Sequence, residues 1–313
     1  MQYRYLALSC ATALSLALAA CGGGGDSTAA VATQPVSGAT DPNAPAVTGD
    51  TATDAINRFN WRRQQIGLLA VSRNAAIDRA AQAHSNYQGL NNTITHFEEA
   101  GKAGFTGAGA ADRLQAAGYS LSASAGYAYG EVIASQGGTQ GVVAADDLIG
   151  AIYHRFIVFE PMFKEAGAGS GTAAGGGLTY VTIDFAANGL DRILSRGNVA
   201  VYPFNGQSDV PASVNSDQES PDPVPGQNRV GYPVSVHGNL GSTLTVQALT
   251  ITPRGGAALA TRLLTHATDG NTPTSAAAAI PLSALVPGTT YDVHFTGTVD
   301  GVAVARNWSF SAQ

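Results

Sequence analysis

The chain has 313 residues, of which 44% are hydrophobic and only 12% are charged. That length allows two domains, and the hydrophobic content is that of a globular protein. The net charge of −6 and the lack of any basic run argue against a nucleic-acid-binding protein, which needs a basic surface to follow phosphates. The 38 glycines fit a loop-rich protein outside the cytoplasm better.

Residues 1–20 predict a lipoprotein signal peptide. Arg4 precedes a long apolar run that ends in small residues directly before Cys21, a pattern typical of export rather than of a membrane span. The Leu-Ala-Ala-Cys sequence resembles the bacterial lipobox, which implies that Cys21 becomes lipidated and is the new N-terminus. The alternative is a plain signal peptide that happens to contain Cys21. Cys10 lies in the removed segment, so we expect no disulfide in the mature chain.

Residues 21–52 are predicted to be a disordered Gly/Ser/Thr/Pro tether, because they contain too little apolar surface to offset the entropy of ordering. Gly22 follows Cys21 directly, whereas the known inner-membrane retention signal is an aspartate at that position. By resemblance to that sorting rule, we expect a lipid-anchored protein of a bacterial cell envelope, in the outer rather than the inner membrane.

Helical periodicity begins near Asp54 and again near Asn74. In the second helix, His84 falls at three-to-four-residue spacing with apolar positions, on the face that we expect to be buried. A buried His84 that donates one ring hydrogen to a carbonyl, in a supporting role, is favoured over direct metal ligation. Another helix is predicted over residues 142–159, a glycine hinge over 167–177 and a strand over 178–185.

Three residues carry the functional hypothesis: His96, Glu131 and His154. Imidazole and carboxylate groups are both common metal ligands and the usual acid–base pair. The three are too far apart in sequence to form a local motif, so only a fold can bring them together. Glu131 stands among apolar residues and is costly to bury unpaired. A salt bridge to Arg113 or Arg155 and a functional role both satisfy this requirement.

The order of short motifs over residues 54–187 resembles the bacterial branch of the CAP superfamily, the cysteine-rich secretory, antigen 5 and pathogenesis-related proteins with an SCP-like domain. The motifs that carry the resemblance are Asn57, Ala80 to Ser85, His96, Asp112 to Tyr119, Gly130 to Ala134, His154-Arg155, Phe163 to Gly169 and Tyr180 to Phe185. The family's Gly-Glu-Asn becomes Gly130-Glu131-Val132, its tryptophan becomes Leu148, and its second glutamate falls on Ala151. These departures concern the site rather than the fold.

The resemblance implies an α+β protein whose CAP domain, over residues 53–192, is an α-β-α sandwich. It also implies a cleft in which His96, Glu131 and His154 hold a divalent metal ion such as zinc, with His84 and Arg155 in supporting positions. Family members have been linked to sterol, lipid and glycan-type ligands. A lipid, glycan or protein ligand in the envelope is therefore expected beside the lipid anchor as a partner of this chain.

Residues 193–228 are predicted to be a linker, because much of this segment is Pro, Asp and Ser. Residues 229–313 show short strands at regular intervals with Gly and Pro between them, which is typical of a small all-β sandwich. The stretch from Leu285 to Tyr291 resembles bacterial immunoglobulin-like or fibronectin-type modules.

Three classes of function remain. A binding protein would hold a divalent cation, or an apolar or glycan-type ligand, in the His/Glu cleft without turnover. A metal-assisted or acid–base hydrolase of peptidase type would use His96 and His154 as ligands or bases and Glu131 as ligand or acid–base group. A structural envelope protein would need neither a bound ligand nor catalytic residues. No Gly-x-Ser-x-Gly or His-Glu-x-x-His motif supports the enzyme, so the binding protein is preferred.

Overall fold

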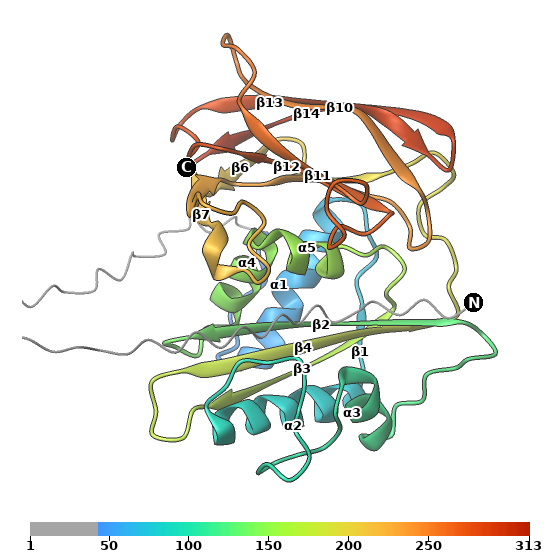
Figure 1. The fold of residues 1–313 in the computed structure, drawn as a ribbon, viewed down its shortest axis with the longest axis vertical. Helices are drawn as coiled ribbons and strands as arrows, with labels where there is room; N and C mark the ends of the chain where they lie inside the picture. Colours follow the sequence, from blue (N-terminus) through green and yellow to red (C-terminus); the bar gives the residue numbers. More distant parts are fainter. Residues whose placement is uncertain (1–42) are drawn as a thin grey trace, which may run out of the picture.

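The structure is a computed structural model, and it describes residues 43–313. The predicted signal peptide, the lipidation site at Cys21 and most of the predicted tether lie outside the described residues. The described chain forms an N-terminal part of helices around one sheet and a C-terminal part of strands (Figure 1).

The N-terminal part is a three-layer α/β/α arrangement. Its sheet, the N-terminal sheet, has the order β1-β3-β4-β2, with β1 parallel to β3 and the other pairs antiparallel. The strands are β1 (Ser72–Arg73), β2 (Tyr127–Gln136), β3 (Glu165–Thr172) and β4 (Thr179–Asn188). Helices α2 (Ala75–Asn91) and α3 (Ala110–Ala116) cover one face, and α1 (Thr51–Gln65), α4 (Gly141–Gly150) and α5 (Ile152–Val158) cover the other (Figure 1).

Local chemistry sets the helix ends close to where the sequence predicts them. The side chain of Asn74 accepts a hydrogen bond from the backbone N–H of Ala76 at 2.9 Å, which caps the start of α2. Asp50 caps α1 in the same way by accepting from Thr53. Gly118, at φ +87°, ends the turn after α3 in a conformation that favours glycine.

The single helix predicted over residues 142–159 is in fact two helices. Ala151 has an extended backbone, with ψ 120°, and it ends α4 and begins α5. The break turns the first backbone N–H groups of α5 toward Glu219, a residue of the C-terminal part that accepts hydrogen bonds from three of them. This partner is remote in sequence, so helical periodicity alone did not reveal the break.

The predicted glycine hinge is largely a strand. Gly167, Gly169 and Gly171 alternate along β3, and a Cβ atom at each would lie only 2.1 to 2.4 Å from the backbone of α2. The glycines therefore form a flat stripe on which α2 lies directly. Side chains of α2 also bond to the β3 backbone, as when Ser85 donates its hydroxyl to the carbonyl of Gly169 at 3.0 Å.

The C-terminal part consists mainly of two four-stranded sheets. The outer sheet has the order β10-β13-β14-β6 and the middle sheet the order β11-β12-β9-β5. Their strands are β5 (Ala200–Tyr202), β6 (Gln207–Val210), β9 (Val234–His237), β10 (Leu244–Pro253), β11 (Thr261–Thr265), β12 (Ala276–Pro281), β13 (Thr290–Val299) and β14 (Val302–Ala312). A small hairpin of β7 (Ser213–Asn215) and β8 (Arg229–Gly231) stands beside them.

The central strands of the middle sheet, β9 and β12, are buried on both faces. All six residues of β12 are buried: Ala277 and Ala279 pack in the core shared with the outer sheet, whereas Ala278 and Ile280 pack against Ile152 of α5. Small and apolar residues on both sides are what a doubly covered strand requires. β12 therefore lacks the alternation of buried and exposed residues that marks a half-buried strand, and it was not among the predicted strands.

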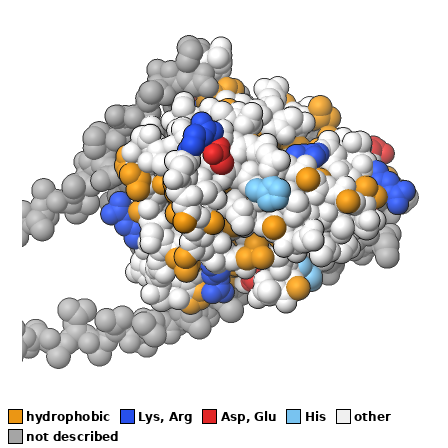
Figure 2. Space-filling model, turned by 90° about the horizontal axis from the view of Figure 1, so that it is seen from above, with side chains coloured by type: hydrophobic (Ala, Val, Ile, Leu, Met, Phe, Trp, Pro, Cys, Tyr) orange, Lys and Arg blue, Asp and Glu red, His pale blue; other side chains and the backbone are white. Residues whose placement is uncertain are grey.

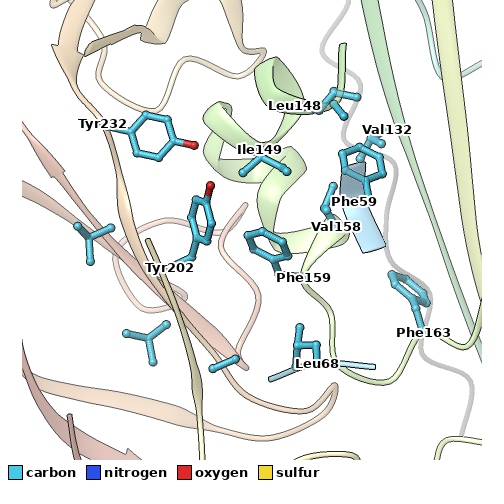
Figure 3. Packing of buried hydrophobic residues seen from close by; sticks show 14 of the residues in the cluster. Phe59, Leu68, Val132, Leu148, Ile149, Val158, Phe159, Phe163, Tyr202 and Tyr232 are labelled. Carbon is cyan, nitrogen blue, oxygen red and sulfur yellow. The ribbon is translucent and has the colours of Figure 1, made fainter. Parts of the chain in front are cut away.

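The two parts share one hydrophobic core at an interface that we call the seam. The rings of Phe159, just after α5, and Tyr202 of β5 lie 4.9 Å apart between centroids. Figure 3 shows Tyr202 and Tyr232 reaching from the C-terminal part toward Phe159 and Ile149. The segment 193–228, predicted as a linker, contributes β5, β6, β7 and a 3₁₀ helix (Ser216–Gln218) to the folded body.

The outer sheet presents a polar and mostly uncharged surface. Along β13, buried and exposed residues alternate, and the exposed ones include Asp292 and His294. The face seen from above in Figure 2 carries scattered hydrophobic side chains and few charged ones. Among the described residues, none of the helices combines the length and the apolar character needed to cross a membrane.

Candidate functional site

A cluster of charged and polar side chains lies buried between the N-terminal sheet and the α2–α3 layer. Glu131 of β2 and Asp184 of β4 are opposite each other in the antiparallel register, so their side chains share one face of the sheet. Arg113 of α3 and His84 of α2 approach the same space from the helices. Each of these four residues is at most 5% exposed.

His84 fastens the loop that follows α2. Its Nε2 lies 2.7 Å from the carbonyl of Thr95, and its Nδ1 lies 2.9 Å from Oε1 of Glu98. Both ring nitrogens thus face acceptor oxygens. Glu98 also accepts hydrogen bonds from the backbone N–H groups of Thr106 and Gly107. The loop that carries His96 is therefore held at both of its ends.

Hydrogen bonds connect Arg113 in the interior, through Glu131, to His96 at the surface. We call this chain of three residues the relay. The Arg113 guanidinium donates to Oε2 of Glu131 and, at 3.2 Å, to the carbonyl of His96. Oε1 of Glu131 lies 2.8 Å from Nδ1 of His96. A carboxylate can only accept, so Nδ1 carries the proton. Nε2 is left without a partner in the described chain, and in the Nδ1–H tautomer it is a hydrogen-bond acceptor.

The electrostatics of the cluster shift the pKa values of its two facing carboxyl groups in opposite directions. Burial acts to raise the pKa of Glu131, but Arg113, the hydrogen bond from His96 and the nearby imidazoles outweigh it, so this pKa lies well below its ordinary value. Burial, then the charge of Glu131, raises the pKa of Asp184 well above its ordinary value. Neither oxygen of Asp184 has a hydrogen-bond partner among the described residues. Of the two carboxyl groups, Asp184 is therefore the one whose surroundings favour the neutral form.

His96 is the part of the cluster that reaches the surface. Its side chain is 21% exposed, and no hydrogen bond within the described chain uses its Nε2. Large apolar side chains that are at least 40% exposed occur on the same loop and at the end of α2: Leu90, Ile94, Phe97 and Phe105. We call these four residues together with His96 the His96 rim.

His154 has a different set of partners. Its Nδ1 lies 2.9 Å from Oε1 of Glu219, which also accepts the backbone N–H of His154 at 3.1 Å. Arg155, expected to support Glu131, instead donates to the carbonyls of Ile149 and Pro233 at the seam. Arg113, the other arginine considered from the sequence, is the residue that pairs with Glu131.

The residues present do not fit the zinc site that the resemblance implies. His96 and Glu131 lie together, but His154 is bound to Glu219, and both oxygens of Glu131 are already engaged. Within residues 43–313, no group of three or more His, Cys, Asp and Glu side chains is arranged to hold a metal ion. A structural or catalytic zinc requires three or four such ligands. The metal hypothesis stays a prediction that this arrangement does not support.

Several members of this network were not identified from the sequence. Asp184 lies in the strand that was predicted over residues 178–185. Which residue lies opposite it depends on the strand register, which the sequence does not give. Glu219 lies in a Pro/Asp/Ser stretch that was interpreted as a linker. Glu98 follows His96 by two residues, and only its acidic character in a turn-rich loop could have drawn attention to it.

Residues 56–185 match the family model described as CAP, the cysteine-rich secretory protein family. The match covers less than half of the chain and includes His84, His96, Glu131 and His154. The chain therefore carries a CAP domain of mixed α and β structure, and the C-terminal sheets lie outside the match. No curated protein matches this chain.

Two solved structures are similar to part of the chain. An extracellular protein containing a SCP domain from Bacillus anthracis is 21% identical, with a TM-score of 0.35, over 43% of this chain and 39% of that one. An outer surface protein from Borrelia burgdorferi is 14% identical, also with a TM-score of 0.35, over 42% of this chain and 89% of that one. The chain thus spans well under half of the length of the first of these structures.

Proposed function

We propose that this protein is exported, lipid-anchored in a bacterial envelope, and binds an apolar ligand with a hydroxyl group at the His96 rim. The observation that carries the proposal is the presentation of His96: Glu131 fixes its Nδ1, Arg113 fixes Glu131, and the unbonded Nε2 belongs to a loop that also carries exposed apolar side chains. An apolar surface supplies affinity, and one oriented acceptor supplies specificity.

A pair of matched lipids tests this proposal. A fluorescent long-chain alcohol can donate a hydrogen bond to Nε2 of His96, whereas its methyl ether cannot. We expect the full chain to bind the alcohol about five-fold or more tightly, the order expected for one hydrogen bond. His96→Ala should remove the difference between the two lipids, and Phe97→Ser should weaken the binding of both.

His154→Ala is the matched control, because His154 interacts with Glu219 and not with the His96 rim. This variant should bind both lipids as the unmodified chain does. Equal binding of alcohol and ether by the unmodified chain would contradict the role of His96. Failure of both lipids to bind would contradict the proposal as a whole.

The alternative is a hydrolase that uses the same residues. The geometry offers His96 as a general base with Glu131 as the carboxylate that orients it. The role of Glu131 as a general acid is not supported, because its low pKa keeps it ionised and both of its oxygens are bonded. Binding without turnover is therefore the better-supported function.

The envelope location rests on Cys21, which lies outside the described residues. Replacement of Cys21 by Ser should release the protein from the membrane fraction into a soluble extracytoplasmic fraction. Membrane retention of this variant, at the level of the unmodified chain, would contradict lipid anchoring at this residue.

A further inference from the structure

A long groove follows the seam on the side of the molecule that bears α1 and α4. Its volume is about 1620 Å³, which exceeds the range typical of small-molecule pockets. Helix α1 contributes one stripe of side chains at helical spacing: Asp54, Asn57, Arg58, Trp61 and Arg62. The opposite wall includes β7 and β8, so both parts of the chain build the groove. We call it the seam groove.

The chain itself enters the molecule along the seam groove. Residues 44–47, Ala-Pro-Ala-Val, line it in an irregular conformation before α1 begins at Thr51. Val47 is 70% exposed, so this segment lies against the wall without filling the space. A non-helical, proline-containing polypeptide is therefore the kind of chain that the groove already accommodates.

Most charges in the seam groove are neutralised within the protein. Arg58 forms a two-pronged ion pair with Asp146, with both bonds at 2.8 Å, and Arg62 pairs with Asp209 at 2.6 Å. Glu219 accepts hydrogen bonds from the first backbone N–H groups of α5 and contacts the His154 ring. These groups offer no charge to a ligand without losing a partner.

Asp147 is the exception among the acidic groups of the groove. It follows Asp146 on α4, it lines the groove, and no hydrogen bond or ion pair engages its carboxyl group within the described residues. Burial, then the neighbouring charge of Asp146, raises the pKa of Asp147 to about 6. Asp147 is exposed to solvent, so its carboxyl group is ionised at neutral pH and accessible to a cation.

We propose that the seam groove binds an extended peptide segment that carries a basic side chain, and that Asp147 receives the cationic group. Among its lining residues this site shares only Ile94 with the His96 rim, and it does not depend on His96. The basis is the backbone of the chain's own residues 44–47 along the wall, together with the unpaired carboxylate of Asp147. Arg229 of β8 also lines the groove without an ion pair in the described chain and donates to the Ser213 hydroxyl. Main-chain contacts would give affinity, and the cation would give specificity.

A glycan is the less favoured occupant, because the aromatic rings in the groove have little free face. Trp61 lies between the guanidinium groups of Arg58 and Arg62, at 4.4 and 4.3 Å from its ring centroid. Tyr202 is covered by Phe159 and Arg155. Sugar rings would therefore find no exposed aromatic surface on which to stack.

The test uses two fluorescein-labelled peptides built on the chain's own sequence. One is Ala-Pro-Ala-Val-Lys-Ala-Pro-Ala-Val, and the other has Gln in place of Lys. Binding to the full chain is measured by fluorescence anisotropy at pH 7.5 and pH 5. We expect the Lys peptide to bind about five-fold more tightly at pH 7.5, the upper range for a partly exposed ion pair. The preference should shrink at pH 5, where Asp147 becomes protonated.

Variants separate the groove from other surfaces. Asp147→Asn should remove the preference for Lys at both pH values, and Asp147→Glu should restore it. Asp191→Asn, which changes an exposed acid outside the groove, should leave the preference intact. Asn57→Trp should weaken both peptides by obstructing the groove, and His96→Ala should change neither.

Each possible result supports or overturns the proposal. Equal affinity for the Lys and Gln peptides at pH 7.5 would overturn the role of Asp147. Failure of both peptides to bind at about 1 mM, the weak end of useful affinities, would overturn the groove as a peptide site. Displacement of the Lys peptide by a chito-oligosaccharide would assign the groove to glycans and overturn the peptide as its ligand.

Discussion

Replacement of Arg113 by Met tests whether the buried relay behind His96 is as tightly coupled as its geometry indicates. The Arg113 side chain is fully buried, and that of its partner Glu131 is 1% exposed. The substitution retains a long apolar side chain but leaves Glu131 with His96 as its remaining hydrogen-bonded partner. Loss of one partner of a buried ion pair costs about 3–5 kcal/mol.

A second estimate comes from the protonation of Glu131. Without Arg113, the cheapest response is for this carboxyl group to take up a proton. Starting from its ordinary value of 4.5, protonation at pH 7 costs about 3 kcal/mol, since each pKa unit corresponds to about 1.4 kcal/mol. At pH 5 the same step costs less than about 1 kcal/mol. The two estimates agree at pH 7, and the second makes the cost dependent on pH.

The direction of this dependence follows from linkage. In the unmodified chain the pKa of Glu131 is lowered on folding, so its contribution is complete above about pH 4.5 and is lost only in stronger acid. In the Arg113→Met variant the pKa of Glu131 in the folded state is raised instead. Its contribution is then lost as the pH rises from 5 to 7, and the variant should be less stable at pH 7 than at pH 5, relative to the unmodified chain.

Urea unfolding of both proteins, followed by circular dichroism at pH 5 and pH 7, measures these differences. The matched control is Arg254→Met, because Arg254 pairs with Asp292 on the surface, with both side chains at least half exposed. The control should unfold as the unmodified chain does. An Arg113→Met variant as stable as the control, or one with the same loss at both pH values, would refute the reasoning.

Four further outcomes are expected. In thermal unfolding, Asp147→Asn should stabilise the protein by about 1 kcal/mol at pH 8 but not at pH 4. The pKa of the solvent-accessible Asp147 is raised on folding, so this group costs stability only as the pH rises from about 4 to 6. Gly169→Ala should cost at least about 2 kcal/mol in urea unfolding, whereas Gly137→Ala, whose Cβ meets only an ordinary contact, should cost little. Calorimetry with Zn²⁺ should show only weak binding, and His96→Ala should abolish it; tight binding would revive the three-ligand site. A chain truncated after Ala187 should aggregate, and cooperative unfolding of that fragment would contradict a shared core.

The N-terminal layers could be predicted from the sequence because their signals are local. Asn74 caps α2 within two residues of its own position, and Gly118 ends the turn after α3 through its own backbone conformation. The order of motifs from Asn57 to Phe185 supplied the CAP resemblance. These features need neighbours along the chain rather than neighbours in space.

The candidate site was only half predictable for the opposite reason. His96 and Glu131 lie together as expected, through a loop that His84 and Glu98 hold in place. His154 has a partner, Glu219, that lies 65 residues further along the chain. No local pattern connects a histidine in a helix with a glutamate in a Pro/Asp/Ser stretch. The resemblance placed His154 in the family's cleft, but in this chain Glu219 binds this histidine.

Burial on both faces of β12 also explains why the relation between the two parts has no local signal in the sequence. A module joined by a linker would have a solvated face toward its neighbour, and β12 would then alternate between buried and exposed residues. Instead Ala276 to Ile280 are buried on both sides, because α5 covers the face that the outer sheet does not. Five apolar residues without alternation carry no strand signal when four of them are alanine, which has little β propensity. The middle sheet is therefore common to both parts: its inner face packs on the outer sheet, and its other face completes the burial of Ile152 and Phe156 in the CAP domain.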